Sequence, residues 1–128
     1  MATPTSDPRH ETIDWEAAEE RACELLRSEG FEIVARNWRC RSGEIDVIAR
    51  DGPVLAFIEV KARRSAAYGG PEGAVHRAKQ RRIIAAARSF LSTAGCELPI
   101  RFDVVTFVGR RSQLYRDAFQ AEDGCSPS

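Results

Sequence analysis

Apolar and polar positions recur with two different periods along the chain, and these periods divide it into helices and strands. Helical spacing runs from Asp14 to Glu29, before Gly30, and returns in a long segment that opens at Gly69-Gly70-Pro71 and stops at Gly95. Runs rich in β-branched and aromatic residues predict strands over residues 31–36, 44–50, 54–63 and 100–108. Residues 113–119 are typical of a short edge strand or a turn of helix.

The predicted order of the core is therefore αβββαβ. Asp51-Gly52-Pro53 lies between two strand signals and predicts a tight hairpin. The three consecutive strands should form an antiparallel meander. The second helix is long enough for a right-handed crossover, which makes strands 54–63 and 100–108 parallel. The expected fold class is α/β, with a mixed central sheet flanked by helices.

Length and composition fit one small domain of 128 residues. Residues 1–12 and 121–128 lack an apolar pattern and are expected to be disordered tails around a domain over 13–120. We find neither a membrane-length apolar run nor a signal-peptide pattern, so we expect a cytoplasmic protein without a membrane partner. The four cysteines are scattered without a CxxC pair, which favours reduced thiols over a zinc site.

The neutral net charge conceals a segregation along the chain. Residues 1–35 carry 3 basic and 9 acidic residues, whereas residues 36–88 carry 12 basic and 5 acidic ones. A basic middle section can offer phosphate groups a local positive field in a neutral protein. The alternative interpretation is that these arginines only keep exposed faces solvated.

The predicted hairpin carries the candidate chemistry. If its turn pairs Arg50 with Pro53, Asp46 lies opposite Phe57 and diagonal to Glu59, and Glu44 faces Glu59. By strand alternation, Glu44, Asp46 and Ile48 share one face, and Glu59 shares a face with Lys61. Unpaired carboxylates are rare inside strands as apolar as IDVIA and LAFIEV.

Facing acids raise one another's pKa, and a hard divalent cation relieves this repulsion. We therefore predict a Mg²⁺ site on Asp46 and Glu59, with Mn²⁺ as a substitute, and assign Lys61 to orient or deprotonate an attacking water. Such a set of groups fits metal-assisted phosphodiester hydrolysis. The alternative for Glu59 and Lys61 is a surface ion pair on an exposed strand. A basic helix with Arg77, Lys79, Arg81 and Arg82 offers a DNA-backbone surface.

The segments GEIDVIARDG, LAFIEVKAR, YGGPEGAV, HRAKQRRIIAAARSFL and RFDVVTF resemble the YraN-like family of small bacterial proteins. The resemblance covers about residues 14–119 and implies a restriction-endonuclease-like fold of the PD-(D/E)XK superfamily, similar to the archaeal Holliday-junction resolvases. It implies that Asp46, Glu59 and Lys61 are catalytic, and that Asp46, Glu59, the Val60 carbonyl and Glu16 hold metal. For Glu16 the alternative is an exposed acid favoured by the helix dipole.

The resemblance also extends to auxiliary and DNA-contacting positions. Glu44 belongs to the GEID block, as an auxiliary acid or a partner of nearby backbone. Trp38 could stack on an unpaired base, although a half-buried core position is the favoured interpretation. The positions expected to contact nucleic acid are Arg63, Arg64, Arg77, Lys79, Gln80, Arg81 and Arg82.

The expected function is a Mg²⁺-dependent DNA endonuclease, with a preference for branched or structured DNA resting on the resolvase resemblance alone. A second hypothesis is a DNA-binding accessory protein of a repair or recombination complex that cuts little by itself. A third is a metal-stabilised scaffold without catalysis. By analogy with the resolvases, a homodimer is also expected.

Overall fold

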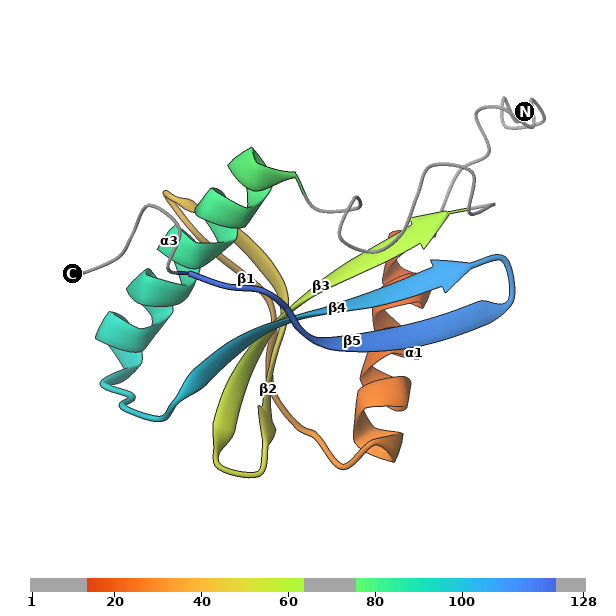
Figure 1. Ribbon diagram of the computed structural model, residues 1–128, viewed down its shortest axis with the longest axis horizontal. Helices are drawn as coiled ribbons and strands as arrows, with labels where there is room; N and C mark the ends of the chain where they lie inside the picture. The colour runs from red at the N-terminus through yellow and green to blue at the C-terminus, as the bar shows by residue number, and fades with distance from the viewer. Residues whose placement is uncertain (1–13, 64–75, 122–128) are drawn as a thin grey trace.

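The computed structural model describes residues 14–63 and 76–121, which form two helices and five strands (Figure 1). In chain order these are α1 (Trp15–Ser28), β1 (Glu32–Cys40), β2 (Gly43–Asp51), β3 (Val54–Arg63), α3 (Arg77–Ala94), β4 (Ile100–Val108) and β5 (Arg111–Phe119). The predicted αβββαβ order is confirmed, with β5 added at its end. The predicted tails and residues 64–75, which include Arg64, Gly69, Gly70 and Val75, lie outside the described residues apart from Ala121.

The five strands form one mixed sheet in the order β1-β2-β3-β4-β5. The pairs β1–β2, β2–β3 and β4–β5 are antiparallel, and β3–β4 is parallel. The predicted meander and the parallel return through α3 are thus both confirmed. β3 lies at the centre and carries Glu59 and Lys61.

The two helices cover opposite faces of the twisted sheet, as Figure 1 shows. On one face, α1 contributes Ala18, Ala22, Cys23 and Leu26 to a cluster with Val47, Ile58 and Val105, among others. On the other face, α3 contributes Ile83, Ile84, Ala86 and Ala87 to a cluster with Ile48, Phe57 and Phe102, among others. Their apolar stripes explain this arrangement, because each helix buries one face against the sheet.

Helix α1 begins and ends close to the residues that the sequence indicates, and α3 ends where the sequence indicates. Asp14 is the N-cap of α1, and its Oδ1 accepts a hydrogen bond from the Ala17 N–H at 3.1 Å. Gly30, just beyond the helix, has a φ of 94° and allows the Phe31 N–H to bond the Leu26 carbonyl. Gly95 ends α3 in the left-handed conformation. The helix itself begins at Arg77 rather than directly after Pro71.

Two strands are longer than their sequence patterns indicate. β1 continues past Arg36 to Cys40, because its backbone goes on pairing with β2 as far as Gly43. Residues 113–119 belong to an edge strand that starts at Arg111 and pairs with β4. In both cases a neighbouring strand supplies order that the local pattern lacks.

The predicted register of the hairpin is wrong by two residues. Asp51 pairs with Val54, so the turn consists of Gly52 and Pro53, and Phe57 lies opposite Ile48 instead of Asp46. Pro53 cannot donate a ladder hydrogen bond, and Gly52 supplies the positive φ of 63° that the turn requires. Because the shift is even, it does not change which residues of β2 and β3 are expected on the same face of the sheet.

The predicted alternation along β2 is also wrong at Asp46. Ile45 packs in the cluster beneath α3 and Val47 in the cluster beneath α1, although alternation would give them one face. Ile45 and Ile48 therefore contact the same side of the sheet. On the neighbouring strand β1, Asn37 has a φ of 53°, so the pleat is irregular there as well.

The remaining expectations on tryptophan and cysteine agree with the structure. Trp38 is half-buried and packs edge-on against Phe90 with ring centroids 5.4 Å apart, which confirms its core position. Cys23, Cys40 and Cys96 are free thiols, and Cys125 lies outside the described residues. No helix among residues 14–63 and 76–121 is long and apolar enough to span a membrane.

Candidate functional site

The site forms where β2 and β3 separate. The last pair of their ladder is Val47 opposite Ile58. Asp46, the residue before Val47, lies just beyond this pair. There the Val60 N–H of β3 donates a hydrogen bond of 2.8 Å to Asp46 Oδ2. A side-chain carboxylate thus takes the place of a main-chain acceptor, which fixes Asp46 at the opening of the sheet.

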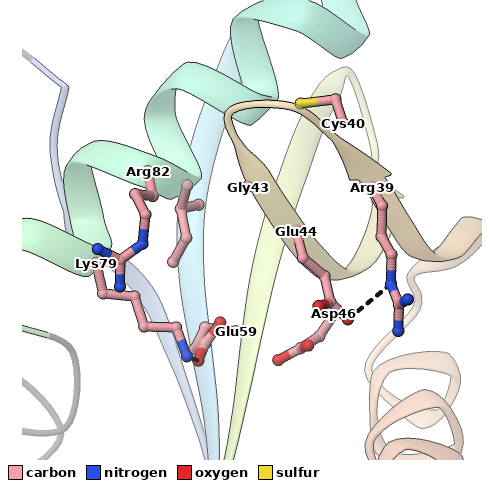
Figure 2. Close-up of a pocket in the computed structure, with 9 residues that line it drawn as sticks. Arg39, Cys40, Gly43, Glu44, Asp46, Glu59, Lys79 and Arg82 are labelled. Atoms are coloured by element: carbon pink, nitrogen blue, oxygen red, sulfur yellow. Dashed lines mark ion pairs between the residues drawn. The ribbon is translucent and has the colours of Figure 1, made fainter.

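Glu59 provides the second carboxylate and is buried, with 3% of its surface exposed. Two lysines approach its Oε2, the nearer being Lys79 of α3, whose Nζ lies at 2.6 Å. The Nζ of Lys61 lies at 3.9 Å. Figure 2 shows Asp46 and Glu59 pointing toward the same space, with Lys79 reaching Glu59 from the helix.

When no metal ion is bound, burial and mutual repulsion disfavour the charged forms of the two carboxylates. Burial, together with the negative charge of Glu59, raises the pKa of Asp46 to about 7. The hydrogen bond from Val60 and the charge of Lys79 oppose this rise without cancelling it. Asp46 is therefore a carboxyl group that binds and releases a proton near neutral pH.

The two lysines are shifted in opposite directions. Burial and the positive charge of Lys79 lower the pKa of Lys61 from its usual value. Burial also acts against the charged form of Lys79, but its hydrogen bond and charge interaction with Glu59 outweigh this and raise its pKa. Lys79 thus remains a firm cation, and Lys61 is the lysine better suited to give up a proton.

Two adjoining cavities open onto these groups, with volumes of about 500 and 340 Å³. Both are lined by Asp46, Glu59, Lys79, Arg39 and Glu44. The larger cavity extends toward Gly43 and α3, where Arg82 and Ile83 contribute. The smaller one extends toward α1 and also includes Val60 and Lys61. Their walls are mostly charged, which suits a polar ligand.

The residues present fit a hard divalent cation. Within the described ranges no three His, Cys, Asp or Glu side chains are close enough to hold a metal together. Mg²⁺ does not need three, because it commonly binds one or two carboxylates and completes its shell with water and substrate phosphate. Asp46 and Glu59 could supply the carboxylates, and Val60 lies beside them.

The predicted acids are not all brought to this site. Glu16 is exposed in the first turn of α1 and lines neither cavity. Glu19, one turn later, lines the smaller cavity. Glu44 lines both, and its Oε2 lies 3.5 Å from Arg39 Nε on the neighbouring strand. This ion pair is well exposed and contributes little to stability.

The predicted DNA-contacting residues are likewise divided. Lys79 lies in the site itself, and Arg82 lines the larger cavity. Arg63 is half-buried at the end of β3, where its carbonyl accepts the Gly109 N–H. Three further residues lie on the first turns of α3 and line neither cavity; these are Arg77, Gln80 and Arg81.

Sequence reasoning missed Asn37, which supports Glu19, and Arg39, which lines both cavities beside the acids. Asn37 Nδ2 donates a hydrogen bond of 2.9 Å to Glu19 Oε1, and Asn37 lines the smaller cavity. Asparagine tolerates positive φ better than most residues, which is the only sequence signal for this kink. Arg39 follows on the same strand and lines both cavities.

Fold and site together define a small α/β protein in which Asp46, the buried Glu59 and Lys61 gather at the split between two strands of a mixed sheet. The family model described as "Uncharacterised protein family UPF0102" matches residues 18–107, and the chain belongs to this family. The resemblance to the YraN-like proteins is thereby confirmed at the level of the family. The matched range contains Asp46, Glu59, Lys61 and Lys79.

Relatives match over most of their length. UPF0102 protein RSc3265 of Ralstonia nicotianae is 46% identical over 124 residues, covering 93% of this chain and 95% of that protein. UPF0102 protein STH1475 of Symbiobacterium thermophilum is 51% identical over 112 residues, covering 83% and 95%. A UPF0102 protein of Anaeromyxobacter sp. is 48% identical over 110 residues, covering 82% and 83%.

Proposed function

We propose that this protein is a Mg²⁺-dependent DNA endonuclease of the PD-(D/E)XK, restriction-endonuclease-like superfamily. The observation that carries the proposal is the meeting of Asp46 and Glu59 at the open end of the β2–β3 ladder, with Lys61 beside them. A carboxylate as buried as Glu59, next to a second, half-buried carboxylate in a charged cavity, is typical of a functional site rather than a structural one.

Each residue has a distinct role in phosphodiester hydrolysis. Asp46 and Glu59 would hold the ion, with the Val60 carbonyl as a further ligand, and Mn²⁺ could replace Mg²⁺. The ion supplies Lewis acidity and neutralises charge on the phosphate when bound. Lys61, on the same face of β3 as Glu59, orients the attacking water and can accept its proton, which its lowered pKa favours.

Lys79 acts as a charge partner for Glu59 and as a phosphate contact. Lys79 lines both cavities, so its ammonium group can also contact a phosphate oxygen of DNA bound there. Arg39 and Arg82 come from different elements and line opposite parts of the larger cavity (Figure 2). Cations arranged around the acids support binding of a polyanion. Selectivity for branched DNA and assembly into a homodimer are proposed by analogy with the Holliday-junction resolvases alone.

The test compares wild type with Asp46→Asn and Glu59→Gln on four-way junction, flap, single-stranded and linear duplex DNA, in Mg²⁺, Mn²⁺ or EDTA. Asparagine keeps the shape of Asp46 and an oxygen for the Val60 N–H, so folding should survive. Glu24→Gln, which changes an exposed acid of α1 outside both cavities, is the matched control.

We expect cleavage by wild type and Glu24→Gln that requires metal, and none by the two site variants. Cleavage that persists in both site variants would overturn the proposal. If wild type binds DNA in the presence of metal but never cuts, the accessory role in a repair or recombination complex replaces the nuclease. Absence of binding to all four DNA forms would remove the nucleic-acid assignment.

A further inference from the structure

Trp15 is the most exposed large hydrophobic side chain in the described part of the chain, with 48% of its surface accessible. It lies at the first position of α1, which Asp14 caps, so its backbone is held by the helix. It belongs to neither of the two apolar clusters that fill the faces of the sheet. Core packing therefore does not account for an indole at this position.

The location of Trp15 connects it to the acids. It lines the smaller cavity, of about 340 Å³, together with Asp46, Glu59, Val60 and Lys61. A ligand that fills this cavity beside the carboxylates would therefore also contact Trp15. This placement separates Trp15 from Val34 and Ile100, the other exposed large apolar residues among those described, which line neither of the two site cavities.

We propose that Trp15 is a stacking platform for an unpaired nucleobase whose neighbouring phosphate lies at the metal site of Asp46 and Glu59, an inference that rests on the proposed function. The cavity combines one aromatic face with cations from Arg39, Lys61 and Lys79. An aromatic ring beside cations is the combination that binds single-stranded nucleic acid, where bases stack and phosphates pair with positive charge.

The charged walls argue against an apolar occupant. The other lining residues are mostly acids, bases and an amide, including Glu19, Asn37 and Glu44. A hydrophobic peptide side chain seated on Trp15 would remove these groups from water without pairing them, which is costly. A nucleobase has an apolar face for the indole and a polar edge for the walls. A base inside a duplex already stacks on its neighbours, so Trp15 selects strands with unpaired bases.

The binding experiment makes Trp15 the only tryptophan, so that indole emission reports on it alone. The chain has two tryptophans, and Trp38→Phe removes the one that packs against Phe90 while keeping an aromatic ring there. The background also carries Asp46→Asn, so that a bound strand stays intact. The probes are oligothymidylate, an abasic strand of equal length and charge, and the matching duplex.

We expect oligothymidylate to quench Trp15 fluorescence, and to bind about tenfold more tightly than the abasic strand. Because the two Trp15 variants lack an indole, affinities of all variants are compared by the fluorescence anisotropy of dye-labelled strands. In that measurement Trp15→Ala should remove the tenfold preference, Trp15→Phe should keep most of it, and Val34→Ala should leave it unchanged. Equal binding of the thymidylate and abasic strands by the parent protein would overturn the inference, as would a preference that survives in Trp15→Ala.

A cleavage experiment separates this inference from the proposed nuclease. Trp15→Ala should lose cutting of unpaired strands while retaining any cutting of duplex DNA. If Trp15→Ala and wild type cut both forms at the same ratio, the stacking role fails and the nuclease stands. If neither protein cuts but the thymidylate strand still quenches Trp15, the stacking role stands and the nuclease fails.

Discussion

Lys79 and Glu59 form an ion pair between α3 and the central strand β3, with Nζ and Oε2 2.6 Å apart. Lys79 is 38% exposed at its side chain and Glu59 only 3%, so the pair reaches from the surface into the sheet. In the metal-free protein Lys79 gives Glu59 the positive charge that the proposed metal ion would otherwise provide. The helix that closes one side of the site is thereby tied directly to one of its acids.

Replacing Lys79 with methionine should destabilise the metal-free protein, because Glu59 would remain buried without its nearest cation. We expect a loss of about 1–3 kcal/mol in the free energy of unfolding, below the value for a fully buried pair since Lys79 is partly exposed. Denaturant unfolding in EDTA measures this loss, and added Mg²⁺ should recover part of it.

Arg81→Met, on the exposed face of the same helix, is the matched control and should change stability by less than about 0.5 kcal/mol. If Lys79→Met and Arg81→Met unfold alike in EDTA, the ion pair does not stabilise the fold.

The raised pKa of Asp46 should make stability depend on pH. Its folded pKa of about 7 lies above the ordinary value of 3.8, so the folded state binds this proton more tightly than the unfolded state. The sign follows from linkage: stability is greatest below the unfolded pKa and falls as pH rises toward the folded one, by at most about 1.4 kcal/mol per pH unit.

The measurement is the free energy of unfolding in EDTA from about pH 5 to about pH 8, for wild type and Asp46→Asn. Wild type should lose stability relative to the variant up to about pH 7 and run parallel to it above. Parallel curves over the whole range would show that Asp46 titrates at its ordinary value.

Glu19, rather than Glu16, should be the acid of α1 that affects the metal. Glu19 lines the smaller cavity and is held by Asn37, whereas Glu16 is exposed and one turn away. We expect Glu19→Gln to weaken Mg²⁺ binding by about tenfold, as for a residue that acts beside the first ligands. Calorimetric titration of Mg²⁺ into both variants provides the comparison, and Glu16→Gln should match wild type.

If Glu16→Gln weakens Mg²⁺ binding and Glu19→Gln does not, Glu16 is a metal ligand, as the family resemblance implies. Equal, wild-type affinity in both variants would show that the two β-strand acids bind the ion without help from α1.

Asp103 should be essential to the sheet but not to the site. It is fully buried and accepts hydrogen bonds from Arg101 Nε and Nη2 at 2.8 Å each, and from the Asp117 N–H at 2.9 Å. Asp103→Ala leaves these donors without their acceptor, which we expect to cost about 3 kcal/mol. Thermal unfolding measures the loss, and the exposed Arg110→Ala is the control.

Mg²⁺ affinity measured on the folded fraction of Asp103→Ala should stay that of wild type. A parallel loss of metal binding would mean that Asp103, which lies opposite Ile58 on the neighbouring strand, also positions Glu59.

Much of the fold could be predicted from short stretches of the sequence. The apolar, β-rich run LAFIEV identified β3, and the alternation of side chains along a strand placed Glu59 and Lys61 on one face, as the structure has them. Helical spacing located α1 and the described part of α3, and Gly95 marked the end of α3. These features depend on backbone periods of two and 3.6 residues, which a short stretch of chain already specifies.

The assembly of the site was decided only by the tertiary structure. The pleat breaks at Asp46 because β2 and β3 separate there and the carboxylate bonds Val60 instead. Lys79 meets Glu59, and Glu19 rather than Glu16 faces the cavity, because packing fixes how each helix is rotated on the sheet. Residues three apart on a helix point about 60° apart. The sequence by itself determined which residues could act, whereas strand separation and helix rotation, set by contacts distant in the chain, decided which of them meet.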